Sequence, residues 1–101
     1  MRSWKSGWTM RVEWLQTALN NLHEEATYLA RDNPRAAAEF IAAIKYRVEQ
    51  LARLPEQGRE GRIVGTREWT VIDRPYLIPY RVRQGRLQVL RIIHTRRALT
   101  L

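Results

Sequence analysis

The sequence predicts an α+β domain with the element order β-α-α-β-β-β, in which a helical hairpin packs on one face of a mainly antiparallel sheet of three to four strands. Two stretches of the first half carry apolar residues at helical spacing and are joined by a short link. The second half is rich in β-branched and aromatic residues and is divided by turn sequences. The chain has 101 residues, which suffices for one such domain with a single modest core.

The start of the chain predicts an extension followed by a strand. Residues 1–9 show no periodicity, and we interpret them as an N-terminal extension to a single domain over residues 10–101. The alternation of Met10, Val12 and Trp14 with the residues between them predicts a short first strand. Thr17 is then the expected N-cap of the first helix.

Apolar spacing predicts the two helices. The first helix should run to about Arg31, and four residues share its apolar face: Leu19, Leu22, Ala26 and Leu29. Asn33 is a suitable N-cap for a second helix, and Pro34 suits its first position because the missing N–H has no helical partner there. This helix should run to about Leu54, since Pro55 prevents continuation. So short a link makes the two helices antiparallel.

Turn residues divide the second half into strands. Residues 55–61 have loop composition, residues 62–64 are a possible strand entry, and residues 66–72 form a stronger strand candidate. Turn chemistry follows at residues 73–75, and the last two strands flank a turn at residues 84–85. Short turns make these strands antiparallel neighbours.

Strand alternation predicts which side chains face the helices. Four residues of the third strand share its apolar side: Tyr76, Ile78, Tyr80 and Val82. The alternate residues lie on the opposite side: Leu77, Pro79, Arg81 and Arg83. Two helices cover only one face of the sheet, so the other face stays open and carries arginine. In the last strand we favour Leu90 and Ile92 inward, which places Arg91 beside Arg81 on the open face.

Charge and composition restrict the class of function. The chain has 18 Lys and Arg against 10 Asp and Glu, a net charge of +8, and residues 51–101 hold eleven arginines against four acidic residues. This asymmetry indicates a polyanionic or acidic partner. Cysteine is absent, which excludes thiolate catalysis and fits a reducing compartment. No apolar run approaches the roughly 20 residues of a membrane span, so we expect a cytoplasmic protein without a membrane partner.

Four stretches of the chain, in this order and spacing, resemble the RelE/ParE superfamily of bacterial toxins. They are the loop at residues 55–61 and residues 65–69 (GTREW), 76–81 (YLIPYR) and 90–97 (LRIIHTRR), and the resemblance covers residues 10–97. It implies the toxin of a type II toxin–antitoxin module, neutralised by a small antitoxin that wraps an extended or helical segment around the toxin. We expect an acidic, partly disordered segment of this antitoxin to cover the arginine-lined open face and the end from His94 to Arg97. RelE-like members cut mRNA in the ribosomal A site, whereas ParE-like members poison DNA gyrase. The resemblance therefore implies either the ribosome and its mRNA or gyrase as the target.

The resemblance matches the RelE catalytic residues only in part. Arg97 falls on the arginine position after the last strand. Glu68 and Thr70 stand where RelE has lysines, Leu77 stands at the position of the third-strand arginine, and we expect no final helix to carry the catalytic tyrosine. His94, at the end of the last strand, is a candidate general acid or base because an unperturbed histidine titrates at about pH 6.5. A histidine at a strand end also serves often as a structural hydrogen-bonding residue, and that alternative stays open.

Further arginines are candidates for binding the substrate or a partner, since a guanidinium contacts phosphate and carboxylate in bidentate fashion. They are Arg62, Arg67, Arg81, Arg91 and Arg96. We expect neither a metal nor a cofactor, because the sequence has no carboxylate cluster to hold a metal ion. We favour a ribosome-dependent mRNA endonuclease that uses His94 and Arg97. The missing lysines and tyrosine favour instead a non-enzymatic gyrase inhibitor, and the third alternative is a basic module that binds an acidic partner or nucleic acid.

Overall fold

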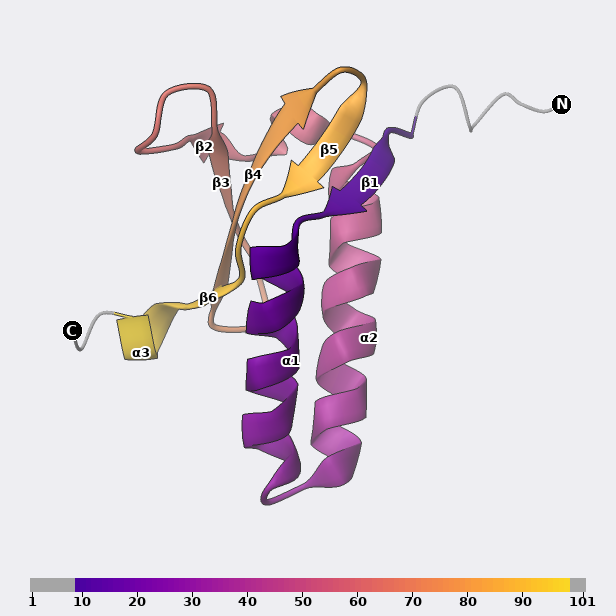
Figure 1. Ribbon diagram of the computed structural model, residues 1–101, viewed down its shortest axis with the longest axis vertical. Coiled ribbons are helices and arrows are strands. Elements are labelled where there is room, and N and C mark those ends of the chain that lie inside the picture. Colours follow the sequence, from indigo (N-terminus) through magenta and orange to yellow (C-terminus); the bar gives the residue numbers. More distant parts are fainter. Residues whose placement is uncertain (1–8, 99–101) are drawn as a thin grey trace, which may run out of the picture.

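The computed structural model describes residues 9–98, which form a helical layer on one face of a sheet (Figure 1). The predicted α+β class is confirmed. The antiparallel helices are α1 (Gln16–Ala30) and α2 (Pro34–Leu51). The strands are β1 (Arg11–Trp14), β2 (Arg59–Glu60), β3 (Arg67–Thr70), β4 (Tyr76–Arg83), β5 (Arg86–Val89) and β6 (Ile93–His94). Two short helical turns complete the fold: the 3-10 turn η1 (Pro55–Gln57) and α3 (Thr95–Ala98). Within residues 9–98, no helix has both the length and the apolar character needed to cross a membrane.

The sheet is mixed and has the strand order β1-β5-β4-β3-β2, with β6 beside the first residues of β4. β1 runs parallel to β5, and the other pairs are antiparallel. The parallel pair is possible because the helical hairpin returns the chain to the end of the sheet where β1 begins. The sheet has more strands than predicted, because the short strand β2 adds an edge and the predicted last strand is divided into β5 and β6. Most of the expected 1–9 extension lies outside the described residues.

The core lies between the sheet and the helices. Its fully buried members include Phe40, Ile44, Ile78, Tyr80 and Leu87. The predicted inward side of β4 is confirmed for Tyr76, Ile78 and Tyr80, whereas Val82 is 47% exposed as the strand approaches its turn. The N-cap of α2 is also confirmed, since Asn33 Oδ1 accepts the Ala36 N–H at 3.2 Å.

Two predicted helix boundaries are wrong. Leu15, not Thr17, precedes α1, and its side chain makes no cap. Its N–H donates to the Val89 carbonyl at 3.1 Å, so pairing with the sheet sets where the helix begins. α2 ends at Leu51 and not near Leu54, because the next residues form a tight turn in which the Leu54 N–H donates to the Leu51 carbonyl at 3.1 Å.

The predicted strand entry at residues 62–64 is wrong. These residues lie in the turn between β2 and β3, which closes where the Gly61 N–H donates to the Thr66 carbonyl at 2.9 Å. Gly65 has a φ of 85° in this turn, a conformation that favours glycine.

The predicted last strand is interrupted after Val89. The Leu90 N–H still donates to the Pro79 carbonyl at 2.9 Å, but the Ile92 N–H donates to the side chain of Asn21 on α1 at 3.1 Å. The interruption changes the alternation of side chains. Ile92 is inward, as predicted, whereas the inward prediction for Leu90 is wrong, because Leu90 lines a groove on the open face. The chain then forms the single helical turn α3, where no final helix was expected.

Candidate functional site

Two hollows among the described residues lie on opposite faces of the sheet. The helix-side cavity, of about 230 Å³, lies between α1 and the C-terminal segment and includes Glu25, Tyr76, His94 and Arg97. The open-face groove, of about 740 Å³, crosses the uncovered face. The two residues of β6 face different hollows. His94 lies opposite buried Tyr76 in the strand register and lines the helix-side cavity, whereas Ile93 lies opposite Leu77 and lines the open-face groove.

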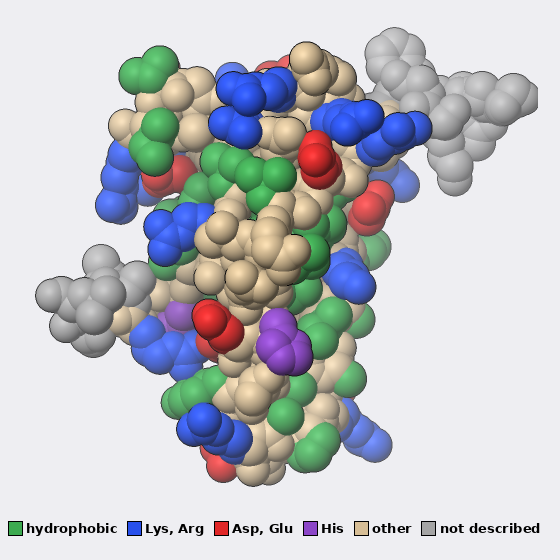
Figure 2. Space-filling model, in the orientation of Figure 1, with side chains coloured by type: hydrophobic (Ala, Val, Ile, Leu, Met, Phe, Trp, Pro, Cys, Tyr) green, Lys and Arg blue, Asp and Glu red, His purple; other side chains and the backbone are tan. Residues whose placement is uncertain are grey.

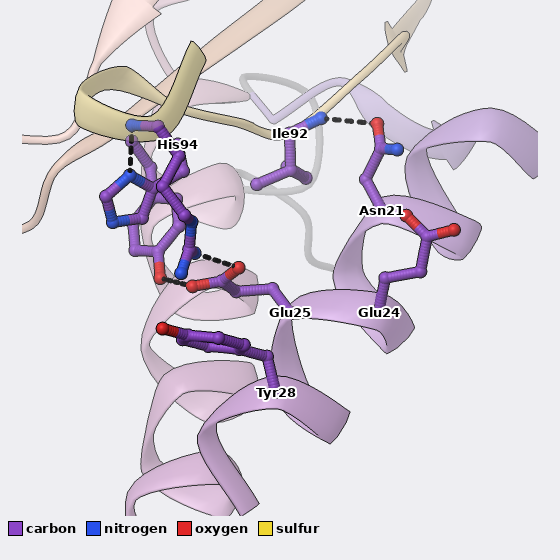
Figure 3. A pocket seen from close by; sticks show the side chains of 8 residues that line it. Asn21, Glu24, Glu25, Tyr28, Ile92 and His94 are labelled. Atoms are coloured by element: carbon purple, nitrogen blue, oxygen red, sulfur yellow. Dashed lines mark hydrogen bonds and ion pairs between the residues drawn. The ribbon is translucent and has the colours of Figure 1, made fainter. Parts of the chain in front are cut away.

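Glu25 of α1 is the centre of the helix-side cavity (Figure 3). The Tyr76 hydroxyl donates to Glu25 Oε2 at 2.5 Å, and the Arg97 guanidinium forms an ion pair with Glu25 Oε1. The same guanidinium lies 4.3 Å from the centroid of the Tyr28 ring, a cation–π contact. The Glu25 side chain is only 14% exposed. This network neutralises the carboxylate and ties α3 to α1.

Tyr76 is a proton donor in this network and stays one at neutral pH. Burial raises its pKa, and the hydrogen bond to Glu25 raises it further, because ionisation would place a phenolate beside a carboxylate. Its ring also lies 4.9 Å from that of Phe40, between centroids, so the hydroxyl is held on a packed ring.

His94 has a structural contact in the same cavity. Its Nδ1 accepts the Arg97 N–H at 3.1 Å at the start of α3, and its ring meets Tyr76 edge-on with centroids 5.2 Å apart. Burial lowers the pKa of His94, and the nearby Arg97 charge lowers it further, so the ring is neutral near pH 7. The hydrogen-bonding role that the sequence left open is therefore present.

The open-face groove combines an apolar floor with an arginine rim. Its floor includes Leu77, Pro79, Leu90 and Ile93, and its rim includes Arg59, Arg62 and Arg91. Glu68, whose side chain is 10% exposed, is the carboxylate of this lining. Its oxygens lie 3.5 Å from Arg59 Nη2 and 3.9 Å from Arg62 Nε. The groove therefore offers apolar contact and excess positive charge.

The predicted site residues lie in separate places. His94 and Arg97 come together in the helix-side cavity, whereas Arg62 and Arg91 line the open-face groove. Arg96 is exposed on α3. The expectation that Arg91 lies beside Arg81 is wrong, because the interruption after β5 leaves Arg91 outside the ladder that pairs β4 with β5.

Two of the predicted binding arginines make structural contacts. Arg67 Nη1 donates to the Gly58 carbonyl at 2.7 Å and fastens the loop before β2. Arg81 Nε donates to Gln88 Oε1 at 2.6 Å, and Gln88 in turn donates to Glu13 on β1 at 2.9 Å. Both guanidinium groups are therefore held by the fold.

Sequence reasoning missed the three α1 residues that face the C-terminal segment. Asn21, Glu25 and Tyr28 stand at i, i+4 and i+7, a helix-face spacing beside the apolar stripe, and this pattern was the available signal. No group of three or more His, Cys, Asp or Glu side chains that could hold a metal ion occurs within residues 9–98.

Comparison with known proteins identifies the class. Residues 12–99 match the family described as the ParE toxin of the type II toxin–antitoxin system parDE, and the chain belongs to this family within the RelE/ParE superfamily. It is 42% identical over 84 residues to the curated protein named "Putative toxin Y4kP" of Sinorhizobium fredii, covering 83% of this chain and 86% of that protein. It is 33% identical over 87 residues to toxin RelE2 of Caulobacter vibrioides, covering 86% and 97% of the two chains.

Solved structures agree with this assignment. A chain of the chromosomal ParDE toxin–antitoxin system from P. aeruginosa superposes with a TM-score of 0.76 at 27% identity, covering 85% of this chain and 96% of that one. The RelBE2 toxin–antitoxin complex of Mycobacterium tuberculosis shares the fold, with a TM-score of 0.61 at 24% identity over 85% and 98% of the chains. The protein is therefore a type II toxin of the RelE/ParE superfamily.

Proposed function

We propose that this toxin arrests bacterial growth by binding a protein target in the cytoplasm, as ParE-like members poison DNA gyrase, and not by cutting mRNA. One observation carries the proposal. The candidate acid–base residue His94 lies in the helix-side cavity, whereas the groove that offers arginines to a partner lies on the other face of the sheet.

Metal-independent cleavage of RNA needs an acid–base group and cationic groups around one phosphate. Here Arg62 and Arg91 are separated from His94 by the sheet. Glu68, the carboxylate in the groove, already pairs with Arg59 and Arg62. A toxin that acts by binding needs none of these groups to converge.

The endonuclease remains a second candidate, and the helix-side cavity is its specific support. A neutral His94 beside Arg97 resembles an acid–base residue with a phosphate-binding partner. Against it, the Arg97 guanidinium is already paired with Glu25, which leaves it less available to bind a phosphate. The contacts of His94 and Arg97 therefore support a structural role for these two residues better than they support a role in RNA cleavage.

Pulse labelling after induction of the toxin distinguishes the two mechanisms. A gyrase-type toxin should leave protein synthesis running at first while DNA damage and filamentation develop, and His94→Gln should arrest growth like the wild type. An immediate stop in protein synthesis with mRNA cuts in the ribosomal A site, abolished by His94→Gln, would establish the endonuclease. Harmless expression would favour the third reading, a basic binding module.

The proposed partner that neutralises the toxin is a cognate antitoxin lying in the open-face groove. The apolar floor fits the apolar side of an amphipathic segment, and Arg91 and Arg62 on the rim fit its carboxylates. Leu90→Asp should then weaken capture of the toxin by its antitoxin, whereas Ile72→Asp, on an 88% exposed residue outside the groove, should not. A complex in which the antitoxin contacts only α1 and α2 would contradict this arrangement.

A further inference from the structure

The turn between β2 and β3 carries two aliphatic side chains into solvent. Ile63 is 72% exposed and Val64 is 98% exposed, and we call these two residues the apolar tip. The turn projects from the outer corner of the sheet (Figure 1), and Figure 2 shows hydrophobic side chains at that corner above basic ones. Turns normally carry Gly, Asn, Asp, Ser or Pro, so adjacent Ile and Val here are unusual.

The turn holds its shape without help from these two side chains. The Thr66 N–H and Oγ1 both donate to the Ile63 carbonyl, at 3.0 Å and 2.6 Å, and the Gly61 N–H donates to the Thr66 carbonyl at 2.9 Å. The contacts come from the backbone and from Thr66, so the fold does not require an aliphatic residue at Val64. A fixed turn also presents its side chains to a partner with little loss of conformational entropy on binding.

Two arginines lie at the base of the turn that carries the apolar tip. Arg59 and Arg62 have side chains that are 71% and 82% exposed, and both pair with Glu68 at the base of the turn. The Arg62 N–H donates to the same carboxylate at 3.3 Å. Two guanidinium groups share one carboxylate, so the base of the turn carries net positive charge beside the apolar tip. Its complement is an apolar pocket with an acidic rim, which is a feature of proteins; a nucleic acid backbone offers nothing to the aliphatic groups.

The two tip residues face different surroundings. Ile63 lines the open-face groove, where the antitoxin segment is placed above, whereas Val64 lies outside that lining. A segment in the groove thus leaves Val64 uncovered. We infer that Val64, at the tip of the turn whose base holds the groove arginines Arg59 and Arg62, is a contact through which the toxin engages its target protein, at a side chain that the antitoxin groove leaves uncovered. The inference rests on the proposed function, since it takes the target to be a protein.

Ile72 provides a matched control for Val64. It is a β-branched aliphatic residue that is 88% exposed on another turn of the sheet, but its neighbour Asp73 is paired with Arg47 at 3.0 Å. An exposed aliphatic residue alone is common on protein surfaces. Comparing Val64→Ser with Ile72→Ser therefore distinguishes an effect specific to the apolar tip from the effect of removing any exposed aliphatic side chain.

The test titrates induction of the full-length toxin in a bacterial host, with and without its co-expressed antitoxin. Val64→Ser should need about tenfold more toxin than the wild type for equal growth arrest, as expected from losing one buried aliphatic contact. Ile72→Ser should match the wild type, and Val64→Ile should restore arrest. All three variants should co-purify with the antitoxin and melt at the wild-type temperature.

Several outcomes would overturn the inference. Growth arrest by Val64→Ser at the wild-type dose would show that the tip makes no contact with the target. Loss of antitoxin co-purification would assign Val64 to the antitoxin interface, and a tenfold loss of binding to a short DNA duplex would indicate a nucleic acid partner. If the wild-type chain itself causes no arrest, the proposed function fails and the inference fails with it.

Discussion

Replacing Arg97 with alanine should lower the free energy of unfolding by about 1–2 kcal/mol, whereas replacing Arg96 should leave it nearly unchanged. The two arginines are neighbours on α3 and carry the same charge. Arg96 is exposed, while Arg97 contacts Glu25 and Tyr28 across the helix-side cavity. The comparison therefore isolates the contacts of Arg97 from the charge of the C-terminal segment.

The magnitude follows from what the alanine removes. The ion pair with Glu25 is partly screened, because the Arg97 side chain is 40% exposed, so it contributes up to about 1 kcal/mol. The cation–π contact with Tyr28 adds about 0.5–1 kcal/mol. Glu25 keeps the Tyr76 hydroxyl as a donor, so its carboxylate is not left without a partner. The backbone hydrogen bond from residue 97 to His94 also survives the substitution.

Urea unfolding at neutral pH measures the difference, with Arg97→Lys as a further comparison. The lysine keeps the charge but loses the planar contact with Tyr28, so its stability should lie between those of the wild type and Arg97→Ala. Equal losses in Arg96→Ala and Arg97→Ala would refute the reasoning, because they would assign the effect to charge alone. A loss of 1–2 kcal/mol leaves a domain of typical stability folded, so toxicity can be compared on folded proteins. Loss of growth arrest by a folded Arg97→Ala protein would return Arg97 to the candidate site.

Three further predictions concern local features of the fold. Asn33→Ala should cost about 1 kcal/mol of stability by removing the cap of α2, and Asn33→Ser should recover most of it. Gly58→Ala should cost about 1–3 kcal/mol, because a Cβ there would lie 2.5 Å from the hydroxyl of the fully buried Tyr80; an unchanged urea midpoint would contradict this. The folded-state pKa of His94 is lowered from 6.5, so the unfolded chain binds the proton more strongly and stability should fall as the pH drops below 6.5. His94→Gln should flatten that part of the pH profile of unfolding, and an identical profile would show that another group is responsible.

The sequence predicted the parts of the fold that local signals determine. The helical hairpin followed from apolar spacing and from the Asn33 and Pro34 pair, and the turn at residues 84–85 followed from its glycine. The interruption between β5 and β6 depends instead on Asn21 of α1, whose side chain accepts a hydrogen bond from the Ile92 N–H. The two residues are 71 positions apart in the sequence. No local pattern contains such a contact. The face of Leu90 and the position of Arg91 beside Arg81 were mispredicted because alternation was carried through this interruption.

The sequence predicted which basic residues are candidates for the site but not how they are arranged in space. The reason is again that contacts between residues distant in sequence leave no local pattern. An arginine's availability to a partner depends on which carboxylate reaches it, and for Arg97 and Arg86 that carboxylate is distant in sequence. Glu25 pairs with Arg97 across 72 residues, and Glu13 lies 3.9 Å from Arg86 on the neighbouring strand. The sequence could therefore not tell which guanidinium groups the fold already uses.

The distribution of carboxylates over the described residues predicts which kind of partner the open face would prefer. On the helix side, Glu25 forms an ion pair with Arg97. On the open face, Arg59 and Arg62 share Glu68, and Arg91 makes no ion pair with any residue from 9 to 98. A partner that brings carboxylates to this rim relieves repulsion among the guanidinium groups, whereas one that binds the helices gains nothing comparable. Binding at the open face should consequently weaken as salt is added, and the apolar floor should keep part of the affinity at high ionic strength, where the exposed charges are screened.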